Sequence, residues 1–289
     1  MDPNDYLTQD QMISLALVAA LLLTSGARRM LDASGLFAAM LVGLVISLLG
    51  HWTWLTIMVV FLVLGSAATR WKFEEKSAMS IQEGNEGVRG WKNVLANGAA
   101  PSIVAILSWQ GDGDWYFLGM ACCASVALSD TLASEIGSLD PRTRSIINLE
   151  AVPPGTNGGM SPTGTLAAIT GSLIIAVVTV LMIPYSHDGF HHSSSLLVDS
   201  RGKAFVLIAI VGWIGCQVDS ILGALLENEG YIGKHSVNFL ATLSGALMAF
   251  IAWGRVFRQV IVRFVLYEVR GLSWERIREY RLEVLLQPL

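Results

Sequence analysis

Eight long apolar segments restrict the fold of this chain more than any other feature. Their approximate bounds are 12–27, 35–50, 52–69, 94–109, 115–133, 164–184, 204–226 and 237–254. A helix that crosses a bilayer needs about 20 mainly apolar residues. Only 15% of the 289 residues are charged, against about a quarter in a soluble domain. The sequence therefore predicts an all-α, polytopic transmembrane helix bundle with about seven or eight spans.

The remaining composition narrows the class further. The formal net charge is -4, and no basic stripe of the kind that binds nucleic acid is present. The three cysteines lie inside apolar segments without disulfide or metal-site spacing, so we interpret them as packing residues. The first apolar segment follows Asp2, Asp5 and Asp10 instead of a basic start, so no cleavable signal peptide is expected.

Lys and Arg residues in short loops predict the orientation of the spans. The acidic N-terminus is expected outside, and the loops 70–92, 138–163 and 228–236 inside. Residues 1–254 are interpreted as one integral domain of the cell membrane, and residues 255–289 as a basic, helical C-terminal segment. Eight spans would place that segment outside despite its seven arginines. Either the span count is wrong by one, or the last apolar segment is re-entrant, or the tail is a surface helix.

The stretch 152–164, VPPGTNGGMSPTG, is an uncharged, glycine-rich loop between apolar segments. Glycines reach positive φ, which lets successive N–H groups point at one anion. Ser161 and Pro162 are a good N-cap and first helical residue, and a helix N-terminus favours negative charge. One hypothesis is a phosphate cradle, and the alternative is a structural turn between two helices. The residue types alone favour neither.

Ionisable groups inside spans are costly and often functional. On a helix, Asp130 and Ser134 share one face, and Glu135 lies on the neighbouring face. Asp219, followed by Ser220, lies on a stripe of small residues that should face another helix of the bundle. The alternative for Asp130 is a carboxylate at the helix end, paired with an arginine of the following loop.

Arg89, Asn93 and Asn97 are four residues apart and would share one face of a helix. Arg binds phosphate through two parallel hydrogen bonds. A solvated charged loop is the alternative for this region. Three histidines at 187, 191 and 192 have no partner at zinc-like spacing, and we interpret their segment as a polar loop.

Carboxylates, a glycine loop and an arginine at the inner ends of spans are the groups needed for Mg²⁺-assisted phosphoryl transfer. Mg²⁺ takes one or two carboxylates together with phosphate oxygens, and donors around the transferring group neutralise its charge. The chain contains no GxxxxGK[ST] motif, so it is not a P-loop enzyme.

Four stretches together resemble the family of phytyl-phosphate kinases and their membrane-protein relatives. They are EGNEGVRGWKNVLANG (83–98), SDTLASEIG (129–137), VPPGTNGGMSPTGTLAA (152–168) and VDSILGALLE (218–227). With Asn238 and the apolar span after it, the resemblance covers about residues 72–254.

The resemblance implies a kinase that converts an isoprenyl monophosphate to the diphosphate with a nucleoside triphosphate, with CTP favoured. Because the chain lacks a long N-terminal extension, a microbial membrane enzyme acting on phytyl or geranylgeranyl phosphate is expected rather than a plastid one. The implied partners are the prenyl phosphate lipid, the nucleotide and the bilayer, and a homo-oligomer is compatible with the sequence. The rival interpretations are a CTP-dependent lipid cytidylyltransferase and a lipid-phosphate transporter or flippase.

Within the matching stretches we assign roles on physical grounds. Asp130 and Asp219 would hold Mg²⁺, with Glu135 beside them, and Arg89 would clamp the transferring phosphoryl group. A lateral groove would take the isoprenyl chain. The expected phosphate- and nucleotide-binding residues are Asn93, Asn97, Ser134, Gly155, Thr156, Asn157, Gly158, Gly159, Ser161 and Ser220.

Overall fold

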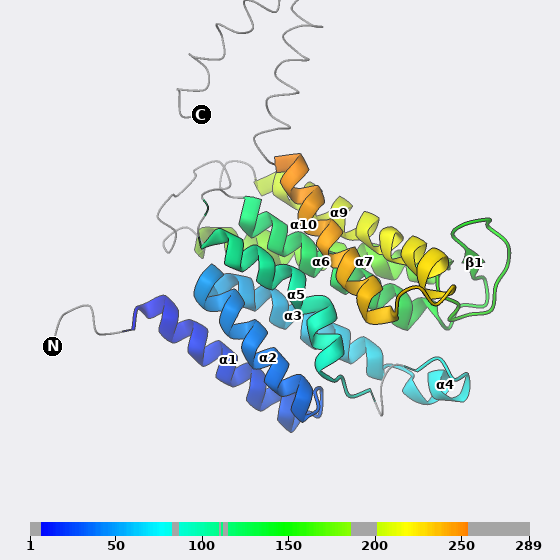
Figure 1. The fold of residues 1–289 in the computed structure, drawn as a ribbon, viewed down its shortest axis with the longest axis horizontal. Coiled ribbons are helices and arrows are strands. Elements are labelled where there is room, and N and C mark those ends of the chain that lie inside the picture. The colour runs from blue at the N-terminus through cyan, green and yellow to red at the C-terminus, as the bar shows by residue number, and fades with distance from the viewer. Residues whose placement is uncertain (1–6, 83–86, 110, 112–114, 186–200, 254–289) are drawn as a thin grey trace, which may run out of the picture.

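A computed structural model describes residues 7–82, 87–109, 111, 115–185 and 201–253, and within them eight long helices form a bundle (Figure 1). These are α1 (Gln9–Ala27), α2 (Ala33–Val45), α3 (Trp52–Arg70), α5 (Trp91–Ser108), α6 (Trp115–Gly137), α7 (Pro162–Met182), α9 (Arg201–Leu222) and α10 (Lys234–Trp253). The shorter elements are α4 (Phe73–Ala78), the π-helical segments η2 (Ile46–Gly50) and η4 (Gly223–Glu227), the 3₁₀ turn η3 (Ile183–Tyr185), and strands β1 (Arg144–Ser145) and β2 (Gly159–Met160).

The predicted fold class is confirmed. Each of the eight apolar segments coincides with a long helix, and the ends agree to about one helical turn. Seven of these helices are long and apolar enough to cross a membrane. The eighth, α5, begins with polar residues that include Lys92 and Asn93 and has Pro101 in its interior. The prediction of about seven or eight spans therefore agrees with the seven candidate spans and the additional long helix α5.

Helix α6 is the centre of the bundle and is packed on all sides by α3, α5, α7, α9 and α10. Small residues on its neighbours allow this close approach. A Cβ on Gly212 would lie 2.0 Å from Ser125 Oγ, and one on Gly215 would lie 2.2 Å from Val126 Cγ2. The small-residue stripe on α9 therefore faces α6, as the sequence predicts, and any larger side chain at these positions would separate the two helices.

One end of the bundle, which we call the loop end, carries the connections between α1 and α2, α3 and α5, α6 and α7, and α9 and α10. In Figure 1 it is the end where α4 and β1 lie. Contacts join these connections: Arg89 N donates to Met30 O (3.1 Å), and Asn228 Nδ2 donates to Asn157 O (3.3 Å). Residues far apart in the sequence are thus assembled into one polar surface.

Helix α1 begins and α10 finishes at the opposite end of the bundle. The predicted basic helical segment 255–289 lies outside the described residues. The histidines at 187, 191 and 192 and the glutamates at 83 and 86 also lie outside the described part of the chain.

Candidate functional site

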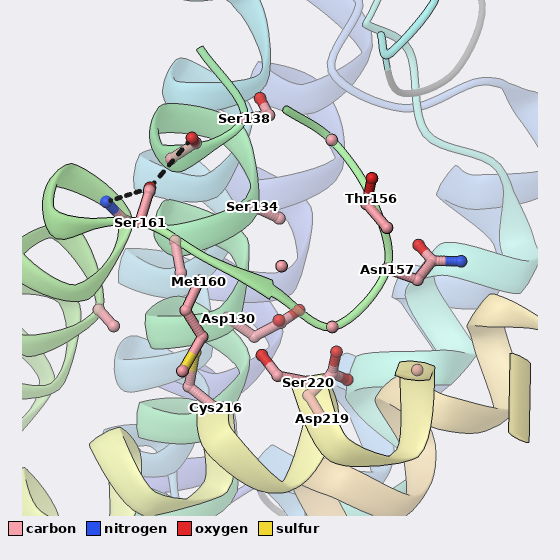
Figure 2. A pocket seen from close by; sticks show the side chains of 18 of the residues that line it. Asp130, Ser134, Ser138, Thr156, Asn157, Met160, Ser161, Cys216, Asp219 and Ser220 are labelled. Carbon is pink, nitrogen blue, oxygen red and sulfur yellow. Dashed lines mark hydrogen bonds between the residues drawn. The ribbon is translucent and has the colours of Figure 1, made fainter. Parts of the chain in front are cut away.

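A polar cavity of about 160 Å³ opens at the loop end. Its walls are the last turns of α6, the first turns of α7 and α10, the end of α9 with η4, and the glycine loop, by which we mean residues 152–161 (Figure 2). The sequence-predicted residues that line it are Asp130, Ser134, Glu135, Gly155, Thr156, Asn157, Gly158, Gly159, Ser161, Asp219 and Ser220. Three of the four matched stretches therefore meet at one place.

Asp130 and Asp219 face each other across this cavity, from α6 and α9 (Figure 2). Their carboxyl groups are close enough to share a side-chain hydrogen bond. The second oxygen of Asp219, Oδ1, is buried without a hydrogen-bond partner among the described residues. Two carboxylates at this separation repel each other unless a proton or a cation lies between them. The arrangement therefore favours binding of a cation.

Glu135 approaches the same cavity from a different face of α6. Its Oε2 accepts a hydrogen bond of 2.5 Å from Lys76 Nζ, and both side chains are buried. Its Oε1 is also buried and has no partner in the described part of the chain. The predicted separation of Asp130 and Glu135 onto neighbouring helix faces is thus observed, and the cavity receives a third carboxylate that is already ion-paired.

The glycine loop is held by strand pairing and by tight packing. β2 pairs antiparallel with β1, with Arg144 opposite Met160. Gly155 and Gly158 have φ values of 81° and 75°, which a residue with a Cβ adopts only at a cost. A Cβ on Gly158 would also lie 2.5 Å from Ala224 Cβ. The structural-turn interpretation therefore accounts for both of these glycines.

The same loop keeps the donors that a phosphate cradle needs. Thr156 N donates to Pro153 O and Gly159 N to Thr156 O, whereas the N–H groups of Asn157 and Gly158 have no acceptor among the described residues. The side chains of Thr156 and Asn157 project from the outer side of the loop, away from Asp130 (Figure 2). The two interpretations of the loop are therefore compatible: the glycines shape it, and the amides of Asn157 and Gly158 are open.

Ser161 is the N-cap of α7, as the sequence predicts. Its Oγ accepts from Gly164 N (3.1 Å) and donates to Gly137 O (3.1 Å), which ties the start of α7 to the end of α6 (Figure 2). This hydroxyl is fully used within the protein, so its place in the cavity wall is structural.

Asp140 fixes the connection that leads into the glycine loop. It accepts two side-chain hydrogen bonds from Arg142 and further bonds from the N–H and hydroxyl of Thr163. The hydrogen bonds from Arg142 hold the pKa of Asp140 well below its usual range. Arg142 is therefore the partner of Asp140, not of Asp130, and Arg144 donates to Leu149 O.

The structure does not bring Arg89, Asn93 and Asn97 to this cavity. Helix α5 begins at Trp91, so Arg89 precedes it and does not share a helical face with the two asparagines. Arg89 is buried and donates to Gly65 O and Thr69 Oγ1 of α3. The expected phosphate clamp is thus placed inside the bundle, away from the facing aspartates.

Sequence reasoning missed Lys234, which lies at the start of α10, lines the cavity and attracts the carboxylate of Asp219. Asn238 lies one turn further along the same helix and also lines the cavity. A signal was present, because Lys234 is the single basic residue of the loop 228–236 and is four residues before Asn238.

Comparison with known proteins places the chain in a family. The family described as Integral membrane protein DUF92 matches residues 16–246. The chain belongs to this family. The match confirms the resemblance to the phytyl-phosphate kinase family that rests on the four stretches.

Relatives of this protein occur in archaea and plants. An uncharacterized membrane protein of Methanocaldococcus jannaschii is 29% identical over 242 residues, which cover 83% of this chain and 93% of that protein. Protein VTE6, chloroplastic, of Arabidopsis thaliana is 32% identical over 237 residues, 76% of this chain and 65% of that protein. Protein PGR, also of Arabidopsis thaliana, is 26% identical over 246 residues, 77% of this chain and 81% of that protein. No solved structure matches the chain.

Proposed function

We propose that this protein is an isoprenyl-phosphate kinase, which transfers a phosphoryl group from a nucleoside triphosphate to phytyl or geranylgeranyl monophosphate. The observation that carries the proposal is the pair of facing aspartates beside the open amides of Asn157 and Gly158 in one cavity at the loop end. The family match supports the prenyl phosphate as substrate, and CTP is the favoured donor because of the resemblance described above.

The residues fit Mg²⁺. Asp130 and Asp219 would hold it, and an unpartnered buried oxygen of Asp219 is available to do so. Within the described residues no group of three or more His, Cys, Asp or Glu side chains forms a metal site by itself. That suits Mg²⁺, which commonly combines one or two carboxylates with waters and substrate phosphates. When bound, the ion neutralises charge on the phosphate oxygens.

The remaining cavity groups would bind and orient the phosphates. The N–H groups of Asn157 and Gly158 would donate to phosphate oxygens, and Lys234 would supply the positive charge that the sequence analysis assigned to Arg89. A phosphate monoester is a competent nucleophile near neutral pH, so positioning and charge neutralisation are the main requirements. The chain thus has no need of a dedicated general base.

The prenyl chain would lie against the apolar part of the cavity wall, where Met160, Ala168 and Cys216 meet between α7 and α9. This wall lies at the end of spans, so a lipid phosphate could keep its chain in the bilayer while its headgroup enters the polar cavity. A bulky residue at Ala168 would obstruct this path.

We place the cavity on the cytoplasmic side of the cell membrane. Within the described residues, every Lys and Arg except Arg201 and Lys203 lies at or near the loop end. Cytoplasmic loops carry an excess of Lys and Arg, and nucleoside triphosphates are cytoplasmic. Accessibility of an introduced cysteine in the loop 228–233 to an impermeant thiol reagent tests this orientation.

The direct test incubates the purified protein with prenyl monophosphates, labelled CTP or ATP, and Mg²⁺. Prenyl diphosphate with release of the nucleoside diphosphate is the expected result. Release of pyrophosphate with a CDP-lipid would instead identify a cytidylyltransferase. The variant Asp219→Asn serves as the negative control and should form no prenyl diphosphate. Absence of prenyl diphosphate with every donor and chain length would refute the proposal.

A further inference from the structure

Three arginines meet where α1 and α3 end, at the loop end of the bundle. Arg28 is the C-cap of α1, Arg29 follows it with a φ of 48°, and Arg70 is the last residue of α3. Arg70 Nη2 donates to the main-chain oxygens of both Arg28 (2.7 Å) and Arg29. This contact gathers three exposed positive charges from two connections on one surface, which we call the arginine cluster.

Within the cluster, the fold itself uses the guanidinium of Arg70. It binds carbonyl groups where α1 ends, and a helix end leaves such groups without intrahelical donors. The side chains of Arg28 and Arg29 make no hydrogen bond or ion pair with other described residues. A left-handed φ is also uncommon for a residue other than glycine, so local structure gives no reason for an arginine at position 29.

Acidic side chains of the neighbouring connections have other partners. Asp32 caps α2 by accepting from Gly35 N (2.8 Å) and Ser34 Oγ (2.6 Å). Glu75 pairs with Lys72 at 2.9 Å. No ion pair among the described residues includes a member of the arginine cluster. Neighbouring positive charges without a counter-charge repel one another, so an anion bound at the cluster would be stabilised by all three.

The apolar surface beside the cluster indicates its depth in the bilayer. Helix α1 is a candidate membrane span at the edge of the bundle, where it packs against α2 and α3 (Figure 1). Leu23 of α1 is 73% exposed, as expected of a side chain that faces lipid. Arg28 lies five residues later, roughly 7.5 Å further along the helix. Trp71, directly after Arg70, is 45% exposed, and tryptophan is enriched at membrane interfaces. The cluster therefore lies at the level of the lipid headgroups.

We propose that the arginine cluster binds the phosphate of an anionic phospholipid in the leaflet at the loop end. A guanidinium group binds phosphate through two parallel hydrogen bonds. Arg28 and Arg29 would supply these bonds, while Arg70 holds the main chain beneath them. The site is separate from the cavity of the facing aspartates, which α6, α7, α9 and α10 form, so it does not depend on the proposed kinase activity. A lipid bound there would stabilise the end of α1 against α3.

The test follows thermal unfolding of the purified protein in detergent during titration with dioleoyl phosphatidylglycerol. Dioleoyl phosphatidylcholine has the same chains without net charge and is the lipid control. The variant Arg28→Gln/Arg29→Gln removes two guanidinium groups but keeps the main-chain oxygens that accept from Arg70, so its Tm without added lipid should equal that of wild type. Arg201→Gln/Lys203→Gln is the matched control, because it removes two exposed positive charges at the opposite end of the bundle.

Phosphatidylglycerol should raise the Tm of wild type more than phosphatidylcholine does. The concentration for half of this effect should increase by about 25-fold in Arg28→Gln/Arg29→Gln, since each cation near an anionic membrane surface contributes roughly a fivefold factor. The control Arg201→Gln/Lys203→Gln should respond to the lipid as wild type does. An unchanged response in Arg28→Gln/Arg29→Gln would overturn the proposal. An equal gain in Tm with phosphatidylcholine, or with inorganic phosphate at the same concentration, would also overturn it, because neither carries an anionic headgroup on a lipid.

Discussion

Gly158→Ala should disturb the site through the backbone of the glycine loop, and Gly230→Ala is its matched control. Both glycines have positive φ, 75° and 73°. A Cβ on Gly230 would meet nothing within 4 Å, whereas one on Gly158 would lie 2.5 Å from Ala224 Cβ and 2.8 Å from Ser220 O. The pair therefore separates the conformational cost of positive φ from the cost of steric overlap.

The magnitudes follow from those two terms. Placing a side chain in the left-handed region costs roughly 1–2 kcal/mol, and both variants should lose this much. Overlap with well-packed neighbours costs a further 1–3 kcal/mol, approximately, and it applies to Gly158→Ala because the Ser220 oxygen belongs to the main chain of α9 and cannot rotate away. At roughly 2–4 °C per kcal/mol, we expect Tm to fall by about 2–8 °C in Gly230→Ala and by about 4–20 °C in Gly158→Ala.

Thermal unfolding of both variants in the same detergent measures these losses. Activity gives the second readout, because an overlap at Gly158 pushes the open amides of the loop away from Asp219. A displacement of about 1 Å can reduce kcat/KM on the order of 100-fold, while Gly230→Ala, outside the cavity, should keep wild-type activity. Equal loss of Tm in the two variants would refute the packing argument, and full activity in Gly158→Ala would refute the role of the loop.

Three further variants test the assigned charges. Asp219→Asn should lower kcat/KM at least ~100-fold, because one facing carboxylate is lost, and Glu74→Gln, on exposed α4, should leave kcat/KM unchanged. Lys234→Gln should raise KM for the nucleotide by about tenfold, because the loss of one charge-assisted hydrogen bond weakens binding by about that factor. Lys203→Gln, at the opposite end of the bundle, should leave KM unchanged. The lowered pKa of Asp140 means that its ionised form stabilises the fold above the unfolded-state value of about 4. Asp140→Asn should therefore lower Tm at pH 7, and its difference from wild type should shrink as the pH falls below about 4; a difference independent of pH would contradict this.

The helices could be predicted from the sequence because hydropathy and length alone specify a membrane span. The predicted helix ends are wrong where polar residues extend a helix beyond its apolar run. Helix α6 continues to Gly137, beyond the predicted limit at 133, because its last turn carries Ser134 and Glu135. Similarly, α5 begins at Trp91, before the apolar run, because its first turn is polar and partly exposed, and the helix becomes buried only from Ala96 and Asn97 onward.

The site could be predicted only where helical spacing decides which residues share a face. That rule places Asp130 and Asp219 correctly toward each other, because both lie within long helices. It fails for Arg89, which lies in an irregular segment, where a spacing of four residues has no geometric meaning. The pair of Lys76 with Glu135 joins residues 59 apart in the sequence, and no local pattern encodes a contact of that kind.

The positions of the three carboxylates on two helices explain how two of them can face the cavity while the third holds the bundle together. Residues 130 and 135 are separated by about 140° around α6, at roughly 100° per residue. Glu135 is thereby anchored to Lys76 on the α3 side, while Asp130 faces Asp219 across the cavity. The anchored carboxylate therefore holds α6 against its neighbours, and only the facing pair is turned to the cavity. The ion pair at Glu135 should therefore keep α6 in place when a cation binds between the aspartates.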